Sequence, residues 1–460
     1  MGYFYPPQLI VNFFILKIFV NCNIFKSTNP DPMKKNKHSL TNYSAVDRQK
    51  ETYIAGMSGQ KPLIPFDLQK LEAKAKSVMS KEAFAYVAGG AGTDSTVRQN
   101  RSDFSKWKIV PRMLRDVSVR DTSIELFGDQ LPFPLLLSPV GVLELAHKRG
   151  DLAVAKAAGQ AGVPMIFSNQ ASFPMEQCAA LMGDSPRWFQ LYWSKSNDLV
   201  ASLVQRAETA GCSAITVTLD TTLLGWRIHD LDLAYLPFLR GKGIAQYVSD
   251  PVFNRLLDEP DDSEPIRQKI TLDTIFNVVE LMRSYPGGFF NNLKSKRPLQ
   301  SVRKFISIYS RPSLTWDDLS FLREQTSLPI VLKGILHPDD ARMAIDHGVD
   351  GIIVSNHGGR QVDGSISTIE ALPNIIEAVD SKIPVLLDSG VRTGADMFKA
   401  IALGAKAVCI GRPFAYGLAI AGEQGVTEVL RNFYADFELT MGLAGCKSIE
   451  EIRQAGLVQG

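Results

Sequence analysis

Eight short apolar segments, each followed by a stretch with helical spacing, constrain the fold of this chain more than any other feature. They end in polar, Gly or Pro residues and cover 135–139, 164–168, 188–192, 214–220, 329–334, 351–356, 384–388 and 407–411. Helical spacing of apolar residues marks the stretches between them, among them 151–161, 198–210, 338–347 and 394–403. Nearly continuous apolar strands alternating with helices indicate a parallel sheet that is covered on its outer face. Eight such units predict an α/β fold, a closed (β/α)8 barrel of the TIM type.

Two segments depart from this pattern. Residues 1–41 form an N-terminal tail with an apolar run over 9–20, which is shorter than the roughly 20 residues that span a bilayer. Three interpretations stay open: translation starts at Met33, the tail associates with a membrane, or it is an ordered extension. We expect one domain over 42–460 with an N-terminal helical extension. Its longest connection, 221–311, follows the fourth strand and is typical of a lid, an oligomer contact or both.

Composition narrows the function classes. Lys and Arg number 50 against 48 Asp and Glu, so the net charge of +2 gives no basic surface for nucleic acid. The five cysteines (Cys22, Cys178, Cys212, Cys409 and Cys446) are widely spaced, without the spacing of a disulfide framework or a metal site. Small buried thiols in a reducing compartment are the simpler interpretation, so we expect a cytoplasmic protein without a structural metal.

Chemically capable side chains gather at the carboxyl ends of the predicted strands. They are Ser168, Gln190, Tyr192, Thr218, Asp220, Lys333, His357, Asp388 and Arg412. In a parallel barrel these ends meet at one mouth, where barrel enzymes have their active sites. Lys333 is the strongest signal, because an ammonium group at the end of a buried strand is costly unless a counter-charge or a ligand receives it.

The segment Ser355–Gln361 (SNHGGRQ) resembles the active-site signature of the FMN-dependent α-hydroxy acid oxidase and dehydrogenase family. Other family-like strings follow in family order, and the resemblance covers about residues 42–456: Tyr86–Ala91, Ser138–Gly141, Phe189–Tyr192, Thr218–Asp220, Leu332–Gly334, Asp388–Arg392 and Ile410–Pro413. Within the family, four loop strings are most similar to the L-lactate 2-monooxygenase subgroup: Trp107–Leu114, Gly225–Arg227, Pro237–Gly241 and Tyr247–Phe253.

The resemblance implies roles for the substrate-facing residues. His357 would be the base, and Asp220 would orient its ring and stabilise the imidazolium, unless Asp220 only caps a helix of the lid. Arg360 would hold the substrate carboxylate with its two-pronged guanidinium, assisted by Tyr86 and Arg227. Tyr192 would donate its hydroxyl to the substrate hydroxyl or ketone oxygen.

The resemblance also implies an FMN site. Lys333 would lie against the pyrimidine edge of the flavin and stabilise the charge that collects there on reduction. Six residues would line the ring: Pro139, Val140, Gly141, Ser168, Gln190 and Thr218. Asp388 would bind the ribityl hydroxyls, and the phosphate would lie among Ser389, Gly390, Arg392, Gly411 and Arg412 near helix N-termini. Ser389 stands where many relatives carry Gly, and Val140-Gly141 where others carry Thr-Ala. No G-x-G-x-x-G follows a strand, and Gly89–Gly92 follows a helical pattern as its C-terminal stop.

These residues together predict the oxidation of a short L-2-hydroxy acid, with L-lactate the first candidate and O2 as the oxidant. Free 2-oxo acid and hydrogen peroxide would result from an oxidase, and acetate, CO2 and water from a lactate 2-monooxygenase. A membrane-linked dehydrogenase that passes electrons to quinone is an alternative that depends on the apolar tail. A second alternative is a flavin-binding barrel that does not catalyse a reaction. The family further implies a homo-oligomer, a tetramer or an octamer.

Overall fold

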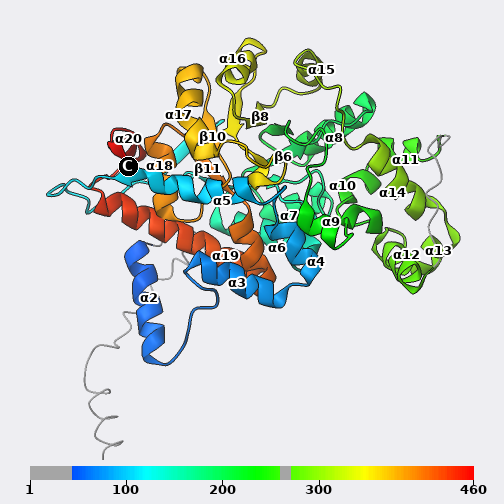
Figure 1. The fold of residues 1–460 in the computed structure, drawn as a ribbon, viewed down its shortest axis with the longest axis horizontal. Helices are drawn as coiled ribbons and strands as arrows, with labels where there is room; N and C mark the ends of the chain where they lie inside the picture. The colour runs from blue at the N-terminus through cyan, green and yellow to red at the C-terminus, as the bar shows by residue number, and fades with distance from the viewer. Residues whose placement is uncertain (1–43, 260–270) are drawn as a thin grey trace, which may run out of the picture. The chain divides into compact units, whose positions relative to one another are not determined.

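Eight parallel strands close into a barrel, and the predicted (β/α)8 fold is confirmed (Figure 1). The computed structural model describes residues 44–259 and 271–460. The barrel strands are β4 (Leu135–Leu137), β5 (Met165–Phe167), β6 (Arg187–Leu191), β7 (Ile215–Thr218), β8 (Ile330–Ile335), β9 (Gly351–Val354), β10 (Val385–Leu387) and β11 (Ala407–Ile410). Each strand pairs with the next, and β11 pairs back onto β4, with Val408 opposite Leu135.

Helices follow the barrel strands where the sequence predicts them. They are α6 (Gly150–Ala161), α7 (Met175–Met182), α8 (Asn197–Thr209), α15 (Asp318–Gln325), α16 (Pro338–Asp346), α17 (Thr368–Val379), α18 (Gly394–Ala402) and α19 (Arg412–Leu443). Short 3-10 turns, η4 (Leu143–Leu145) and η6 (His357–Gly359), follow β4 and β9. The last helix, α19, is interrupted at Ala421 and Gly422, whose backbone angles are not helical.

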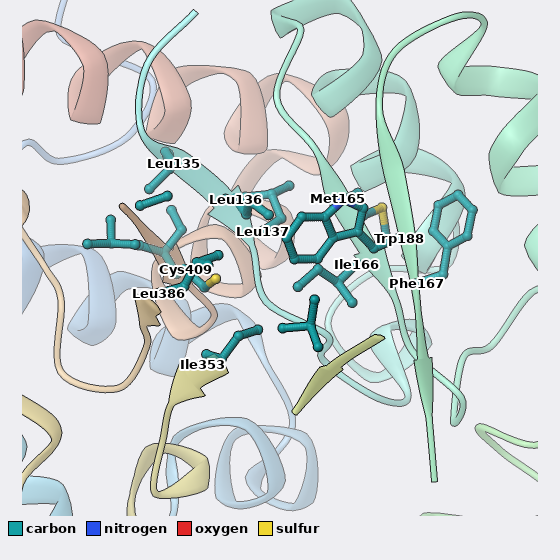
Figure 2. Close-up of a cluster of buried hydrophobic side chains, with 14 of the residues drawn as sticks. Leu135, Leu136, Leu137, Met165, Ile166, Phe167, Trp188, Ile353, Leu386 and Cys409 are labelled. Carbon is teal, nitrogen blue, oxygen red and sulfur yellow. The ribbon is translucent and has the colours of Figure 1, made fainter. Parts of the chain in front are cut away.

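The core lies within and around the barrel. Every residue of β4, β5, β9, β10 and β11 is buried. Figure 2 shows part of this core, in which Leu136, Ile166 and Trp188 come from three successive strands, and Cys409, from a strand near the end of the chain, pairs with Leu136. Burial on both faces explains why these strands are continuous apolar runs rather than alternating ones.

Elements before the barrel form the predicted helical extension. They are α2 (Ala45–Met57), α3 (Leu68–Val78), α4 (Lys81–Ala88), α5 (Ser95–Ser102) and η3 (Asp103–Lys106). Two small antiparallel sheets pair β1 (Trp107–Ile109) with β12 (Leu457–Gln459), which follows α20 (Ile449–Arg453), and β2 (Ile124–Leu126) with β3 (Asp129–Leu131). The apolar run over 9–20 and the start at Met33 lie outside the described residues. Among the residues that are described, no helix is long and apolar enough to cross a membrane.

The long connection between β7 and β8 is mainly helical. It contains α9 (Ile228–Asp232), η5 (Pro237–Arg240), α10 (Ala245–Val248), α11 (Pro251–Leu256), α12 (Leu272–Ser284), α13 (Phe289–Lys294) and α14 (Arg297–Ile308). In Figure 1, α12, α13 and α14 lie together, and α12 contacts both of the others. Phe238 of η5 packs between Tyr86 of α4 and Phe305 of α14, so aromatic rings join this connection to the helical extension.

Candidate active site

A cleft lies at the carboxyl ends of the barrel strands. Fifteen of the residues that the sequence analysis selects line it: Tyr86, Pro139, Val140, Gly141, Tyr192, Arg227, Lys333, His357, Arg360, Asp388, Ser389, Gly390, Arg392, Gly411 and Arg412. Residues from α4, the insertion and the ends of six barrel strands therefore converge on one cleft.

Three residues that were expected to touch the flavin ring do not line this cleft. Ser168 donates to Gln190 at 3.2 Å, and Gln190 donates to Thr218 at 2.9 Å, so they form a hydrogen-bonded row across β5, β6 and β7. All three are buried. Their side chains hydrogen-bond one another inside the barrel, as buried polar groups generally need a hydrogen-bond partner.

His357 and Asp220 form a direct pair. Asp220 Oδ1 lies 2.7 Å from His357 Nδ1, and the Thr221 hydroxyl lies 3.3 Å from the same nitrogen. Burial lowers the pKa of His357, which favours the neutral imidazole. Burial would raise the pKa of Asp220, but the charges of His357 and Lys333 outweigh it and lower that pKa to about 2. The first helix of the insertion begins only at Ile228, so Asp220 does not cap it.

The backbone after β9 explains the two glycines that follow His357. His357, Gly358 and Gly359 have φ angles of +57°, +66° and +77°. Successive left-handed residues favour glycine, which has no Cβ to clash. A Cβ at Gly358 would lie 2.8 Å from Arg412 Nη1, and one at Gly359 would lie 2.7 Å from the Val97 nitrogen. The glycines thus let the base loop approach both Arg412 and α5.

Lys333 receives the counter-charges that its burial demands. Its side chain, in a residue only 3% exposed, donates to the Ser355 hydroxyl at 2.9 Å. The ammonium lies 3.3 Å from Asp388 and 4.0 Å from Asp220. Burial disfavours the charged form, but the two carboxylates outweigh it and raise the pKa of Lys333. The ammonium is therefore a permanent positive charge at the bottom of the cleft.

Two guanidinium groups lie together near Tyr86. Arg360 donates to the Gly89 carbonyl at 2.7 Å and lies 5.0 Å from the centre of the Tyr86 ring, while Arg227 donates to Gln361 at 2.9 Å. Among the described residues, no carboxylate lies within 4.0 Å of either guanidinium. Burial and the neighbouring Arg227 lower the pKa of Arg360 to about 9. This charge excess is suited to an incoming carboxylate.

Two tyrosines complete the cleft wall. Burial raises the pKa of Tyr86, and burial together with Asp220 raises that of Tyr192 to about 12. Both phenols are therefore protonated at neutral pH and can donate. Neither hydroxyl makes a hydrogen bond within the described parts of the chain, although both tyrosines line the cleft.

A second pair of guanidiniums lies at the far end of the cleft. Arg392 donates to its neighbour's carbonyl at Val391, and Arg412 donates to the carbonyls of Val87, Gly89 and Gly358. Burial and Arg412 lower the pKa of Arg392 to about 10. Again, no carboxylate of residues 44–259 or 271–460 lies within 4.0 Å of either group.

The residues present fit FMN. The second guanidinium pair matches a dianionic phosphate, and the Lys333 ammonium with Asp388 matches a polar ring edge and ribityl hydroxyls. Ser389 itself has φ +72°, a conformation that glycine adopts more readily than serine. Gly411, which lines the cleft, precedes the first turn of α19.

Several residues of this site were missed by the sequence analysis. Ser355 and Gln361 belong to the signature string, where position alone could have indicated them. Gln361 donates to the carbonyls of Asp220 and Leu223 and accepts from Gly225 and Arg227, so it fastens the start of the insertion to the base loop. His229, at the start of the insertion, lies 2.7 Å from Asp94 in the helical extension. No sequence signal marks such long-range pairs.

Known proteins resemble this chain over most of its length. Residues 75–459 match the family model described as FMN-dependent dehydrogenase. An L-lactate oxidase of Lysinibacillus sphaericus is 42% identical over 88% of this chain and 96% of its own length. A glycolate oxidase of Spinacia oleracea is 38% identical over 85% of this chain and 94% of its own length. A crystal structure of mandelate oxidase superposes with a TM-score of 0.69 at 35% identity, covering 86% of this chain and all of the other. The chain belongs to the FMN-dependent dehydrogenase family, whose relatives here are α-hydroxy acid oxidases, and its cofactor is FMN.

Proposed function

We propose that this protein oxidises a short L-2-hydroxy acid, with L-lactate as the first candidate, and that O2 is the final oxidant. The observation that carries the proposal is the convergence of His357, Arg360 and Lys333 in one cleft. Each supplies a different requirement of the reaction: a base, a carboxylate clamp and a positive charge beside the electron acceptor.

Substrate binding would begin at the first guanidinium pair. Arg360 would take the substrate carboxylate in a two-pronged contact, and Tyr86, which packs under Arg360, would donate its hydroxyl to the same group. Arg227 would add positive potential from the insertion. Because both guanidiniums are held by neutral acceptors only, binding a carboxylate breaks no ion pair.

Proton removal would be the work of His357. Asp220 occupies Nδ1, so Nε2 is the ring nitrogen left to accept the proton that leaves the substrate. A neutral imidazole can accept it, and the Asp220 carboxylate then stabilises the imidazolium. Tyr192 would donate to the substrate oxygen as it becomes a ketone.

FMN, when bound, supplies a two-electron acceptor. Lys333 would meet its pyrimidine edge, with Pro139, Val140 and Gly141 along the ring. Asp388 would bind ribityl hydroxyls, and Ser389, Gly390, Arg392, Gly411 and Arg412 would hold the phosphate.

Two outcomes with O2 are compatible with this site. As an oxidase the protein would convert lactate and O2 to pyruvate and hydrogen peroxide. As a lactate 2-monooxygenase it would retain pyruvate until peroxide decarboxylates it, which gives acetate, CO2 and water. Similarity to L-lactate oxidases supports the first outcome, and the loop strings in the insertion support the second. We further infer a homo-oligomer, with the insertion over 221–311 acting as a lid.

An anaerobic experiment tests the proposal. The purified yellow holoprotein is mixed with L-lactate, flavin bleaching is followed, and air is then admitted while pyruvate, peroxide and acetate are assayed. We expect bleaching with lactate and none with His357→Gln, whereas His347→Gln, at the C-cap of helix α16 and outside the cleft, serves as the matched control. The absence of bleaching with lactate, glycolate, mandelate and longer 2-hydroxy acids would refute the proposal. Electrons passed to a quinone but not to O2 would instead favour the dehydrogenase alternative.

A further inference from the structure

Asp230 is a buried acid that no step above uses. The residue is only 8% exposed, and its Oδ1 atom is fully buried without a hydrogen-bond partner. No hydrogen bond of the described residues reaches its side chain, so it caps no helix and holds no loop. A buried polar group without a partner costs free energy, and its retention calls for a physical reason.

The position of Asp230 is fixed by its neighbours on α9. His229 lies 2.7 Å from Asp94, and Arg227, just before the helix, donates to Gln361 at 2.9 Å. Helix α9 also packs against α4, which carries Tyr86. The Asp230 carboxyl is therefore held in place although it makes no hydrogen bond itself.

The charge of Asp230 acts on the substrate clamp from outside the cleft lining. Arg360 and Arg227 line the cleft, whereas Asp230 does not. Burial raises the pKa of Asp230, while the charges of Arg360 and Arg227 partly offset this and favour the carboxylate; its charge in turn favours the protonated form of Arg360. No ion pair within 4.0 Å joins the described Asp230 carboxyl to either guanidinium, so both stay available to a ligand.

We propose that Asp230 limits how tightly the Arg227–Arg360 pair holds a carboxylate, and thereby sets how quickly the 2-oxo acid product leaves. This inference rests on the proposed function. When Asp230 is ionised, its negative charge repels any carboxylate that enters the clamp. It offsets part of the attraction of two guanidiniums, which would otherwise hold substrate and product alike.

The expected size follows from one unit charge. For two unit charges beyond ion-pair contact, taken as roughly 7 Å apart in an effective dielectric constant of about 40, Coulomb repulsion corresponds to about a tenfold change in affinity. Removing the charge in Asp230→Asn should therefore tighten binding of a dead-end carboxylate about tenfold. Product release should slow, so that a larger share of turnovers yields acetate and CO2 and a smaller share yields free peroxide.

The test compares Asp230→Asn with Asp232→Asn, an exposed residue on the same helix. Holoprotein is titrated with oxalate and the shift of the flavin spectrum is followed, because this readout needs no turnover. Peroxide and acetate yields from lactate are then measured. We expect tighter oxalate binding only in Asp230→Asn, with unchanged thermal stability. A second variant, Asp230→Ser, removes the same charge with a smaller side chain and should also bind oxalate more tightly. It keeps the test decisive if Asp230→Asn misfolds.

Unchanged or weaker oxalate binding in well-folded Asp230→Asn and Asp230→Ser would overturn the inference. Equal tightening in Asp232→Asn would also overturn it, since the effect would then be a general one of net charge. Failure of the proposed function is distinguishable, because lactate would then leave the flavin oxidised even though oxalate titrations still report on the clamp.

Discussion

Gly334 offers a sharp test of how the barrel supports the base. It lies at a bulge of β8, where the register shifts between Lys333 and Ile335, and its φ is +112°. A Cβ at this position would lie 3.0 Å from Asp220 Cβ and 3.1 Å from Asp220 Cγ. Because carbon atoms prefer separations of about 3.5–4.0 Å, Gly334→Ala must push Asp220 back by a few tenths of an ångström.

That displacement has a calculable consequence. It would stretch the 2.7 Å contact between Asp220 and His357 beyond 3 Å. A hydrogen bond to a charged group contributes about 1.5–3 kcal/mol, so weakening it in the transition state slows the reaction, with its complete loss, roughly 10- to 150-fold, as the upper limit. The unfavourable φ should also cost about 1–3 kcal/mol of stability.

Stopped-flow flavin reduction by lactate without O2 measures the rate, and thermal unfolding measures the stability. Gly348→Ala is the matched control, because Gly348 also has a positive φ, +68°, but nothing lies within 4 Å of an added Cβ. We expect both variants to lose stability and only Gly334→Ala to lose rate. A Gly334→Ala protein that is destabilised but reduces its flavin at the native rate would refute this reasoning.

Three further predictions follow from the same structure. The pKa of Asp220 in the folded protein is about 2, below its ordinary value, so its ionisation stabilises the fold by roughly 2 kcal/mol above pH 4, and this stabilisation is lost as the pH falls towards 2. Denaturant unfolding at pH 4 and at pH 2 should therefore show a smaller loss of stability in Asp220→Asn than in the wild type. Gln361→Ala should raise KM for lactate more than it lowers kcat, since it releases Arg227 and the start of the insertion; steady-state kinetics will show this. Buried Asp151 accepts a hydrogen bond from Ser172 with one oxygen only, and burial raises its pKa to about 7. The wild type should therefore lose stability as the pH rises from about 4 to 7, because the folded protein must then bury a carboxylate, whereas Asp151→Asn should not. Urea unfolding at pH 4.5 and 7.5 measures this difference.

Local pattern was enough to predict the barrel and most of the cleft. The eight apolar runs match the eight strands because burial on both faces leaves an unbroken signal in each one. Strand-end residues such as Lys333 and Asp388 were placed correctly because every parallel strand ends at the same mouth.

The sequence could not predict which way the strand-end side chains point, or how the insertion packs on the helical extension. Ser168, Gln190 and Thr218 also stand near strand ends, yet their side chains pair with one another instead of lining the cleft. Which way a side chain points there depends on the tilt and register of the closed barrel. Asp230 and His229 gained their significance only when the insertion packed on the helical extension, a contact between distant segments that no local pattern encodes.

The insertion leaves the barrel after β7 and returns at β8, and these two strands are direct neighbours with Thr218 opposite Lys333. Its two ends are therefore already brought together by the sheet, and the entropy of closing such an excursion rises by only about 0.6 kcal/mol for each doubling of length. The segment can thus be treated as an exchangeable cassette. Exchanging this segment between relatives should alter which acids enter the cleft and how long products stay, while the barrel residues Lys333 and His357 keep their places.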